Sequence, residues 1–301
     1  MPEQMTHQFR ILLVEDDESS YDPITRWLKE EGYVVRLATS YREAKSALET
    51  DHFHLAIIDM RLVDEDQKNE EGLQLLEDIE QLQLQNIMPT IVITAHPQFA
   101  SKAWELKADR LVIKEAGFLK KLLGVVRELQ QEKVRINFDL EYVSDSLNVL
   151  EDVAADVNWS MAERPSTKLL APQVRDLFGK LFVDARSLFV SKLKPGLTGA
   201  AVVRIQPTWN GGLGRSYVAK VGRKDKVETE QRHYEANVKH FLTANAVTQA
   251  DVHYSRHLGT LLYTFAENQG VALKEFDDFY HRSDASHIIT SLRELFEQTY
   301  R

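Results

Sequence analysis

Five short apolar runs alternate with longer amphipathic segments through residues 9–132, and this alternation constrains the fold more than any other feature. The runs are rich in β-branched residues and nearly free of polar ones, which is typical of strands covered on both faces. They are Ile11–Val14, Tyr33–Leu37, Leu55–Ile58, Thr90–Ile93 and Leu111–Ile113, and the amphipathic segments are Tyr21–Glu31, Tyr41–Glu49, Glu71–Gln83, Gln98–Glu105 and Phe118–Lys133. Five strand–helix pairs predict an α/β domain with a doubly wound, five-stranded parallel sheet.

The second half of the sequence has a different texture. Residues 134–165 are polar and acidic, and strands with Gly and Pro turns between them follow further on. We predict helices over Ser144–Val157, Pro172–Lys194, Asp225–Thr243 and Ser286–Arg301, and strands over Ala200–Ile205, Ser216–Val221 and Thr260–Phe265. This pattern indicates a second, α+β domain with an antiparallel sheet. The predicted organisation is therefore a domain over 1–133, a helical linker over 134–170 and an output domain over 171–301.

Composition narrows the class of protein. The chain has 301 residues, of which 43% are hydrophobic and 28% charged, so each of two domains can bury a core of its own. The net charge of −9 disfavours nucleic acid as a partner, and the absence of cysteine excludes disulfides and thiol catalysis. No apolar run approaches the roughly 18 residues that span a bilayer, and residues 1–8 lack the apolar core of a signal peptide. We expect a cytoplasmic protein without a membrane partner.

Carboxylates follow two of the predicted strands. Glu15, Asp16 and Asp17 come directly after the first strand, and Asp59 comes directly after the third. The carboxyl ends of neighbouring parallel strands meet at one edge of a sheet, so these side chains should converge. Clustered carboxylates repel one another unless a cation neutralises them, and Mg²⁺ prefers such oxygen ligands. The sequence therefore predicts a magnesium site at this edge.

Two further polar residues lie at the ends of the fourth and fifth predicted strands. Thr94 ends the fourth strand and offers a hydroxyl, while Lys114 follows the fifth and offers an ammonium that can reach a phosphoryl oxygen. Acids for a metal, a carboxylate nucleophile, a hydroxyl donor and an ammonium are together sufficient for phosphoryl transfer to an aspartate.

Residues 9–133 resemble the receiver domain of bacterial response regulators, whose fold is flavodoxin-like. The segments that carry the resemblance, each at a strand end, are ILLVEDD, IIDM, IVITA and VIK. The resemblance implies that Glu15 and Asp16 are the metal-binding acidic pair and that Asp59 is the phosphoacceptor. It also implies that Asp59 and the backbone carbonyl of Arg61 complete the ligands of a Mg²⁺ ion.

The same resemblance implies roles for Thr94 as the switch hydroxyl and Lys114 as the phosphate-pairing lysine. The implied phosphodonor is a sensor histidine kinase or a small phosphorylated molecule.

The sequence departs from the receiver pattern at three places. Leu111 stands where the family usually has an aromatic switch residue, and Glu115 stands where it usually has a proline in a cis peptide. The segment VDEDQKNEE, residues 63–71, lengthens the interval between Asp59 and Thr94, and we interpret it as a solvated acidic loop. Arg61 and His96, two positions beyond Asp59 and Thr94, correspond to positions that tune phosphorylation and hydrolysis rates in receivers.

A second resemblance covers roughly residues 170–280. Gly196 and Gly199 lie in a turn before a strand, Lys220 lies in the next strand, and Glu230 follows in a helix. This order resembles the small lobe of protein kinases and the ternary-complex-associated domains of bacterial signalling and conflict-system proteins. It implies that Lys220 contacts a nucleotide phosphate and that Glu230 holds the lysine. The alternatives are an ion pair with a structural role, or a surface strand and an exposed helix face.

Phosphotransfer by the second half is not expected. The segment His281-Arg282-Ser283-Asp284 has the wrong spacing for a kinase catalytic loop, and we predict that it is a surface turn capping the last helix. The second half also lacks a basic recognition helix, so the sequence does not indicate a transcription factor.

The sequence thus favours a two-component response regulator in which Mg²⁺-dependent phosphorylation of Asp59 switches a non-DNA-binding output domain. The expected partners are a phosphodonor, a protein that binds the output domain, and, through the linker, a second copy of the chain. Beyond the receiver's own phosphorylation and dephosphorylation we expect no enzyme activity. The alternative is a receiver-regulated, kinase-like phosphotransferase whose large lobe is absent from this chain.

Overall fold

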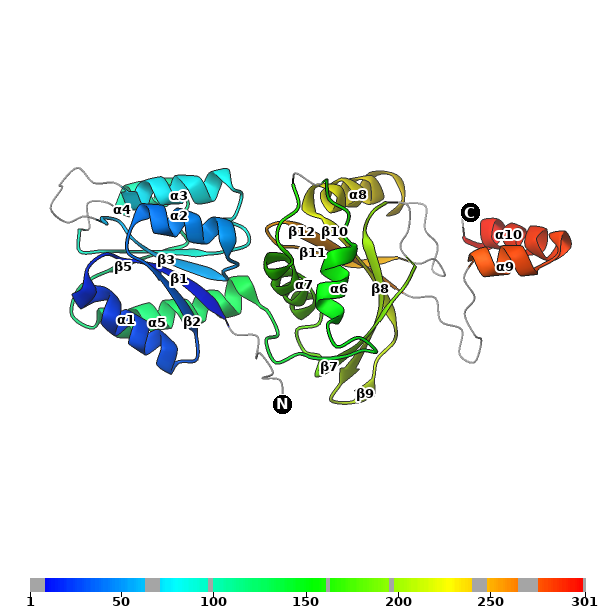
Figure 1. The fold of residues 1–301 in the computed structure, drawn as a ribbon, viewed down its shortest axis with the longest axis horizontal. Coiled ribbons are helices and arrows are strands. Elements are labelled where there is room, and N and C mark those ends of the chain that lie inside the picture. The colour runs from blue at the N-terminus through cyan, green and yellow to red at the C-terminus, as the bar shows by residue number, and fades with distance from the viewer. Residues whose placement is uncertain are drawn as a thin grey trace. The chain divides into compact units, whose positions relative to one another are not determined.

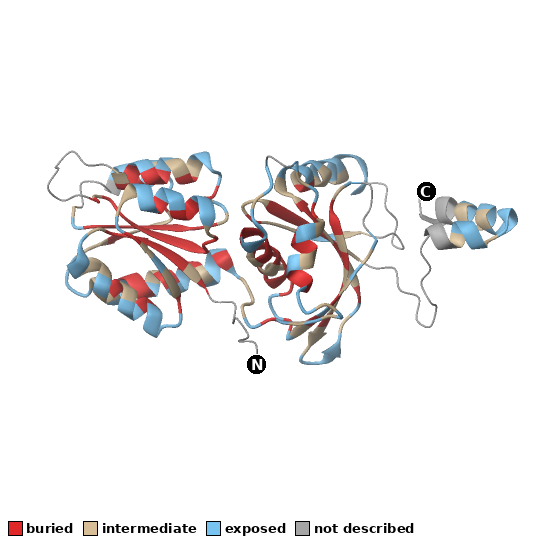
Figure 2. Ribbon diagram, viewed as in Figure 1, coloured by how far each residue is buried: buried red, intermediate tan, exposed pale blue. Residues whose placement is uncertain are grey.

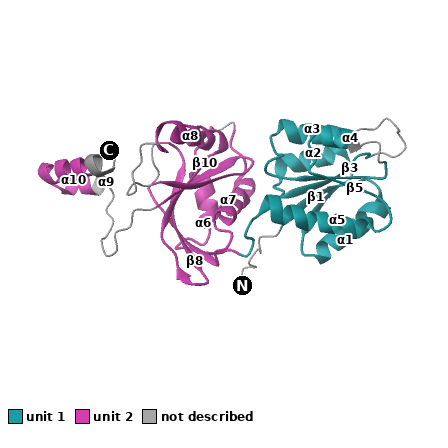
Figure 3. Ribbon diagram, turned by 180° about the vertical axis from the view of Figure 1, so that it is seen from behind, with its two compact units in different colours: residues 1–139 teal, residues 140–301 magenta. Residues whose placement is uncertain are grey.

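The computed structural model describes residues 9–62, 71–96, 100–160, 163–194, 198–239, 248–264 and 276–299. The chain divides into two compact units, Met1–Asp139 and Leu140–Arg301, which we call the N-terminal unit and the C-terminal unit (Figure 3). Within the described ranges, no helix combines the length and the apolar character that crossing a membrane requires.

The N-terminal unit is a parallel sheet between two layers of helices. Its strands lie in the order β2-β1-β3-β4-β5. They are β1 Arg10–Val14, β2 Val34–Ala38, β3 Leu55–Asp59, β4 Thr90–Thr94 and β5 Arg110–Ile113. The helices are α1 Glu18–Glu30, α2 Tyr41–Thr50, α3 Glu71–Gln81, α4 Ala100–Glu105 and α5 Phe118–Leu129, with a π-helix at Gln130–Val134. The predicted doubly wound, five-stranded parallel sheet is confirmed.

Burial on both faces explains why the strands are almost wholly apolar. In β1, Ile11 and Leu13 face the layer of α1 and α5, while Leu12 and Val14 face the layer of α2 and α3 (Figure 1). All four side chains are fully buried. Each such side chain contributes about 1.5–3 kcal/mol relative to exposure, so neither face tolerates a polar substitution. Figure 2 shows the buried strands between helices whose outer faces are exposed.

The C-terminal unit has a mixed, mostly antiparallel sheet in the order β11-β12-β10-β8-β7-β6, with β9 paired to β8. Among the described strands of this unit, only β6 and β7 pair in parallel. The strands are β6 Glu141–Val143, β7 Ser187–Lys192, β8 Ala201–Trp209, β9 Gly212–Leu213, β10 Tyr217–Arg223, β11 Gln249–Tyr254 and β12 Leu258–Thr264. The predicted second domain of α+β type is confirmed.

Helices cover both faces of this sheet. Helices α6 (Val149–Asp156) and α7 (Thr167–Leu181) pack on one face, against side chains such as Ala219 and Val221 of β10. Helix α8 (Lys224–Asn237) packs on the other face, where Val227 lies against β12. Since neighbouring residues of a strand point to opposite faces, Lys220 lies on the α8 side of β10. Residues 140–157, assigned to a linker from the sequence, contribute β6 and α6 to this unit.

One predicted element is wrong. The helix expected over Pro172–Lys194 ends at Leu181, and its last part is strand β7. In β7, Leu188 and Val190 are buried, while Phe189 between them is exposed, which is the period of a half-buried strand. The short apolar run is compatible with either structure locally, and pairing with β8 decides in favour of the strand.

A buried amide ties α7 to the distant turn between β11 and β12. Gln173 has no exposed surface, and its Oε1 accepts hydrogen bonds from Ser255 Oγ and His257 N, both at 2.9 Å. Its Nε2 donates to Leu169 O at 2.9 Å. The same turn also holds the first residue of the helix α8, because Lys224 N donates a hydrogen bond to His257 O at 2.9 Å.

The last described elements are α9 (Phe276–Arg282) and α10 (Ala285–Thr299). Asp284 Oδ1 accepts hydrogen bonds from His287 N at 2.8 Å and Ser286 Oγ at 2.6 Å, so it caps α10. The predicted capping of the last helix is confirmed at Asp284, but His281 and Arg282 end α9 instead of forming a turn.

Candidate functional site

The polar strand ends of the N-terminal unit converge, as the topology requires. Glu15 follows β1, Asp59 ends β3, Thr94 ends β4 and Lys114 follows β5, so parallel pairing brings them to one edge of the sheet. One carboxylate oxygen from each of Glu15, Asp16 and Asp59 lies within 4.8 Å of the others. We call these residues with Lys114 the acidic site.

Lys114 bridges the two buried carboxylates of the acidic site. Its Nζ lies 2.7 Å from Glu15 Oε2 and 2.9 Å from Asp59 Oδ2. The side chain of Glu15 has no exposed surface and that of Asp59 is 10% exposed. The backbone holds the lysine in place, because Lys114 N donates to Thr94 O at 2.8 Å.

The electrostatics of the acidic site favour an additional cation. Burial, and secondly the charge of Asp59, raises the pKa of Glu15 to about 7. Burial also raises the pKa of Asp59, although Lys114 opposes the shift. Burial lowers the pKa of Lys114, but attraction to Asp59 and Glu15 outweighs it, so the pKa is raised overall. One ammonium thus compensates the carboxylates only in part, and oxygen donors this close fit a hard divalent ion.

Asp17 does not belong to this site, although it continues the acidic run. Its side chain caps α1, accepting from Ser19 N at 3.1 Å, Ser19 Oγ at 2.7 Å and Ser20 Oγ at 2.8 Å. These hydrogen bonds lower the pKa of the Asp17 carboxyl. Within the acidic run, Asp17 therefore caps a helix, while Glu15 and Asp16 contribute to the acidic site.

Arg61 and His96 contact each other beyond the ends of β3 and β4. Arg61 Nη1 lies 2.9 Å from His96 Nε2, and His96 N donates to Thr94 Oγ1 at 3.0 Å. The Thr94 side chain is buried. Leu111 packs against the hydrophobic core on the α2–α3 side of the sheet, and no peptide bond in the described ranges is cis. Of the predicted acidic loop, residues 63–71, all but Glu71 lie outside the described residues, and Glu71 begins α3.

Sequence reasoning missed Gly72, which determines how closely α3 approaches the backbone of Asp59. A Cβ at this position would lie 2.2 Å from Asp59 O and 2.7 Å from Met60 Cα. Only glycine lets the first turn of α3 pack against this backbone. The acidic run before it offers no local signal, since the requirement comes from tertiary packing.

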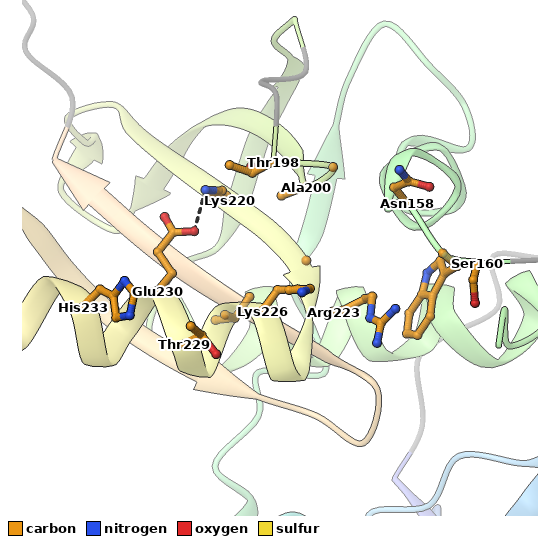
Figure 4. Close-up of a pocket in the computed structure, with 14 residues that line it drawn as sticks. Asn158, Ser160, Thr198, Ala200, Lys220, Arg223, Lys226, Thr229, Glu230 and His233 are labelled. Atoms are coloured by element: carbon orange, nitrogen blue, oxygen red, sulfur yellow. Dashed lines mark hydrogen bonds and ion pairs between the residues drawn. The ribbon is translucent and has the colours of Figure 1, made fainter.

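A second polar cluster lies in the C-terminal unit. Lys220 Nζ of β10 and Glu230 Oε2 of α8 are 2.6 Å apart, and Tyr263 Oη donates to Glu230 Oε1 at 3.1 Å (Figure 4). The structure thus brings together the lysine and the glutamate singled out from the sequence. Of the two turn glycines, Gly199 has a φ of +70°, and Gly196 lies outside the described residues.

The pair borders a cavity of about 630 Å³, which we call the α8 pocket. Four segments line it: the residues that follow α6, the turn before β8, the end of β10, and α8. The lining residues used below are Trp159, Lys220, Gly222, Arg223, Lys226 and Glu230.

Comparison with known proteins gives a family for most of the N-terminal unit. Residues 11–126 match the family described as response regulator receiver domain. Residues 11–126 are therefore a response regulator receiver domain, and a second α+β domain of unidentified family follows them.

Two curated relatives match part of the chain. The transcriptional regulatory protein BasR of Escherichia coli is 31% identical over 107 residues, covering 35% of this chain and 45% of its own length. An uncharacterised 14.6 kDa protein of Leptolyngbya boryana is 26% identical over 143 residues, covering 48% of this chain and 99% of its own. The chain thus spans less than half the length of BasR.

Solved receiver structures also match. A CheY-like receiver domain protein of Methanospirillum hungatei is 29% identical with a TM-score of 0.37, covering 42% of this chain and 96% of that one. TrrA of Thermotoga maritima, solved in complex with Mg²⁺-BeF, is 26% identical with a TM-score of 0.35, covering 40% and 99%.

Proposed function

We propose that phosphorylation of Asp59 switches the C-terminal unit between two interaction states, in a response regulator that does not bind DNA. The observation that carries the proposal is the convergence of Glu15, Asp16, Asp59 and Lys114 at one edge of a receiver sheet. A sensor histidine kinase or a small phosphodonor supplies the phosphoryl group, in the cytoplasm.

Asp59 is the nucleophile. Its ionised carboxylate oxygen forms a bond to phosphorus while the bond from phosphorus to the donor's oxygen or nitrogen breaks. Because burial raises the pKa of Asp59, the carboxylate depends on neighbouring positive charge to stay ionised. Lys114 provides part of that charge at 2.9 Å.

The residues that would hold Mg²⁺ are Glu15, Asp16 and Asp59, with the backbone carbonyl of Arg61. Their clustered oxygens and the raised pKa of Glu15 fit a divalent cation. When bound, Mg²⁺ supplies charge that offsets the negative charge of the transferring phosphoryl group.

Lys114 and Thr94 carry the switch. Once an Asp59 oxygen is bonded to phosphorus, Lys114 exchanges a carboxylate oxygen for a phosphoryl oxygen, and the Thr94 hydroxyl turns toward the same group. Thr94 Oγ1 now accepts from His96 N, so its movement changes the backbone after β4. Leu111 replaces the usual aromatic, so we propose transmission through this backbone rather than through an aromatic rotamer.

The test is labelling with radioactive acetyl phosphate in the presence of Mg²⁺. Wild type is labelled, and Asp59→Asn is not. Asp22→Asn is the matched control, because it makes the same chemical change at an exposed position of α1, where Asp22 pairs with Arg26 at 2.8 Å. Equal labelling of wild type and Asp59→Asn would remove the basis of the proposal.

A second candidate is a receiver-regulated, kinase-like phosphotransferase completed by a lobe that these residues do not supply. The observation in its favour is the 2.6 Å Lys220–Glu230 pair, which follows a turn containing Gly199 in the chain order that a kinase small lobe has. ATP binding that is lost in Lys220→Met supports this candidate. Absence of ATP binding leaves the output unit as a protein-interaction module.

A further inference from the structure

The α8 pocket carries more positive than negative charge. Lys220, Arg223 and Lys226 line it, against the single carboxylate Glu230. This balance is the reverse of the chain's, which has a net charge of −9. In the view of Figure 4, Lys220 and Glu230 lie toward one end of the pocket, Asn158 and Ser160 toward the other, and Arg223 and Lys226 between them.

The cations differ in how they are engaged. Lys220 is bound to Glu230. Arg223 is held in place by Asp225, with Nε to Oδ1 at 3.0 Å, and by Glu163, with Nη1 to Oε2 at 3.1 Å. These two carboxylates are 55% and 60% exposed, so water screens them. Lys226 is exposed at the edge of the pocket, and it forms no ion pair or hydrogen bond with any side chain in the described ranges, so its ammonium is available to a ligand.

The start of α8 adds positive potential at the same place. No side chain caps this helix. Lys224 N donates to His257 O, and the other N–H groups of a first turn have no partners within the helix. Three of the four residues from Arg223 to Lys226 are cationic, although the N-terminal end of a helix dipole favours acidic residues. The first turn of α1, by contrast, begins with the cap Asp17 and the acidic Glu18. A bound anion would relieve this unfavourable arrangement.

Small residues keep the pocket open. Gly222 and Ala200 form part of its lining, and a Cβ on Gly222 would lie 3.4 Å from the Ala200 Cβ. The volume of about 630 Å³ lies within the range of small-molecule sites. Guanidinium, ammonium and helix N-terminal N–H groups are the donors that bind phosphate.

We propose that the α8 pocket binds the phosphate group of a small molecule through Lys226, Arg223 and the first turn of α8. This site differs from the contact that the kinase resemblance implies, which rests on Lys220. It does not depend on phosphorylation of Asp59.

The test uses the full chain with Asp59→Asn, without divalent ions, so that the acidic site takes no part. Inorganic phosphate is titrated at constant ionic strength while the indole N–H resonances of the four tryptophans are followed. Trp159 lines the pocket, and its Nε1 is buried without a hydrogen-bond partner among the described residues. We expect its resonance, assigned with Trp159→Phe, to shift in a saturable way.

Lys226→Glu is the decisive variant, because this exposed lysine supports no contact that folding needs. It should weaken phosphate binding by about tenfold or more, by replacing attraction with repulsion. Without phosphate it should raise the midpoint of thermal unfolding, since an acidic residue suits a helix start. Lys239→Glu makes the same charge change beyond the end of α8 and should leave the affinity unchanged. Equal affinities of these two variants, or a shift that does not saturate, overturn the proposal.

Two further ligands separate the sources of the phosphate group. Tighter binding of ribose 5-phosphate than of inorganic phosphate supports a small-molecule ligand. Tighter binding of a phosphoserine peptide than of ribose 5-phosphate overturns it in favour of a phosphorylated protein segment.

Discussion

The acidic site and the α8 pocket each place a lysine against a glutamate, at 2.7 Å and 2.6 Å. Their surroundings differ. Glu15 has no exposed surface and a second carboxylate, Asp59, shares its lysine, whereas Glu230 is 35% exposed and has cationic neighbours. The same ion pair therefore lies in an excess of negative charge in one unit and of positive charge in the other.

This difference teaches that the pair itself does not define the ligand. Carboxylates left uncompensated around a lysine favour a metal cation, and lysine or arginine left uncompensated around a glutamate favours an anion. Burial determines how strongly each pair resists disruption, because a charge that loses its partner is costly only where water cannot replace it.

The largest expected effect is that of Lys114→Met. It leaves the buried Glu15 and Asp59 without their shared cation, which should cost about 3 kcal/mol or more of unfolding free energy at pH 8 without divalent ions. Native-state hydrogen exchange resolved by peptide reports the N-terminal unit separately. Lys121→Met is the control, since Lys121 is 54% exposed and lies 3.8 Å from Glu115. Similar losses in the two variants would mean that the acidic site tolerates an unpaired carboxylate.

The next effect is a pH dependence. The pKa of Glu15 is about 7 in the folded chain and has an ordinary value of 4.5, so the folded state binds the extra proton between these values. Without divalent ions, the N-terminal unit should therefore gain stability as pH falls from 8 to 5, by about 3 kcal/mol at most, and lose it as pH rises again. The raised pKa of Asp59 acts in the same direction. Glu15→Gln should make the stability of the N-terminal unit depend less on pH. If the dependence is unchanged in this variant, groups other than Glu15 cause it.

Glycine substitutions compare the packing of the two sites. Gly72→Ala places a Cβ 2.2 Å from Asp59 O and should cost about 1–3 kcal/mol and slow phosphorylation by shifting β3 or α3. Gly222→Ala meets nothing closer than 3.4 Å and should cost less than about 1 kcal/mol. Gly124→Ala, in the middle of α5 with open space around it, should stabilise by about 0.5–1 kcal/mol. Urea unfolding measures all three, and a harmless Gly72→Ala would show that α3 can move away.

The smallest effect is that of Lys220→Met. Glu230 keeps its hydrogen bond from Tyr263 and can be rehydrated, so the loss should be about 1 kcal/mol, seen as faster hydrogen exchange in β10 and α8. Lys239→Met removes an exposed i, i+4 pair with Glu235 and should cost about 0.3–0.5 kcal/mol. If Lys220→Met lost as much unfolding free energy as Lys114→Met, the two ion pairs would not differ in the way that their burial predicts.

The acidic site could be predicted because the carboxyl ends of parallel strands all lie at the same edge of a sheet, so residues that follow different strands come together there. Each strand end is marked locally by the change from apolar to polar residues, so Glu15, Asp59 and Lys114 could be placed together without knowing any contact. Gly72 could not be found in this way, since its requirement arises from a helix packing on a strand end distant in sequence.

The C-terminal unit was harder to predict for the same physical reason. Strand β7 is a short apolar run whose identity depends on pairing with β8, and helix periodicity described it equally well. Lys226 in a charged segment looks like any solvated lysine. Only the fold shows that it lines a cavity at an uncapped helix start.

The buried amide of Gln173 has a consequence for the growing chain on the ribosome. Its partner His257 is 84 residues further along, and at about 5–20 residues per second the ribosome needs about 4–17 s to reach it. Until then the Oε1 atom of Gln173 can find a partner only in water, so α7 cannot complete its packing before His257 has been made. Nascent chains stalled before Ser255 should therefore leave α7 open to proteases, although every residue of that helix has already been made.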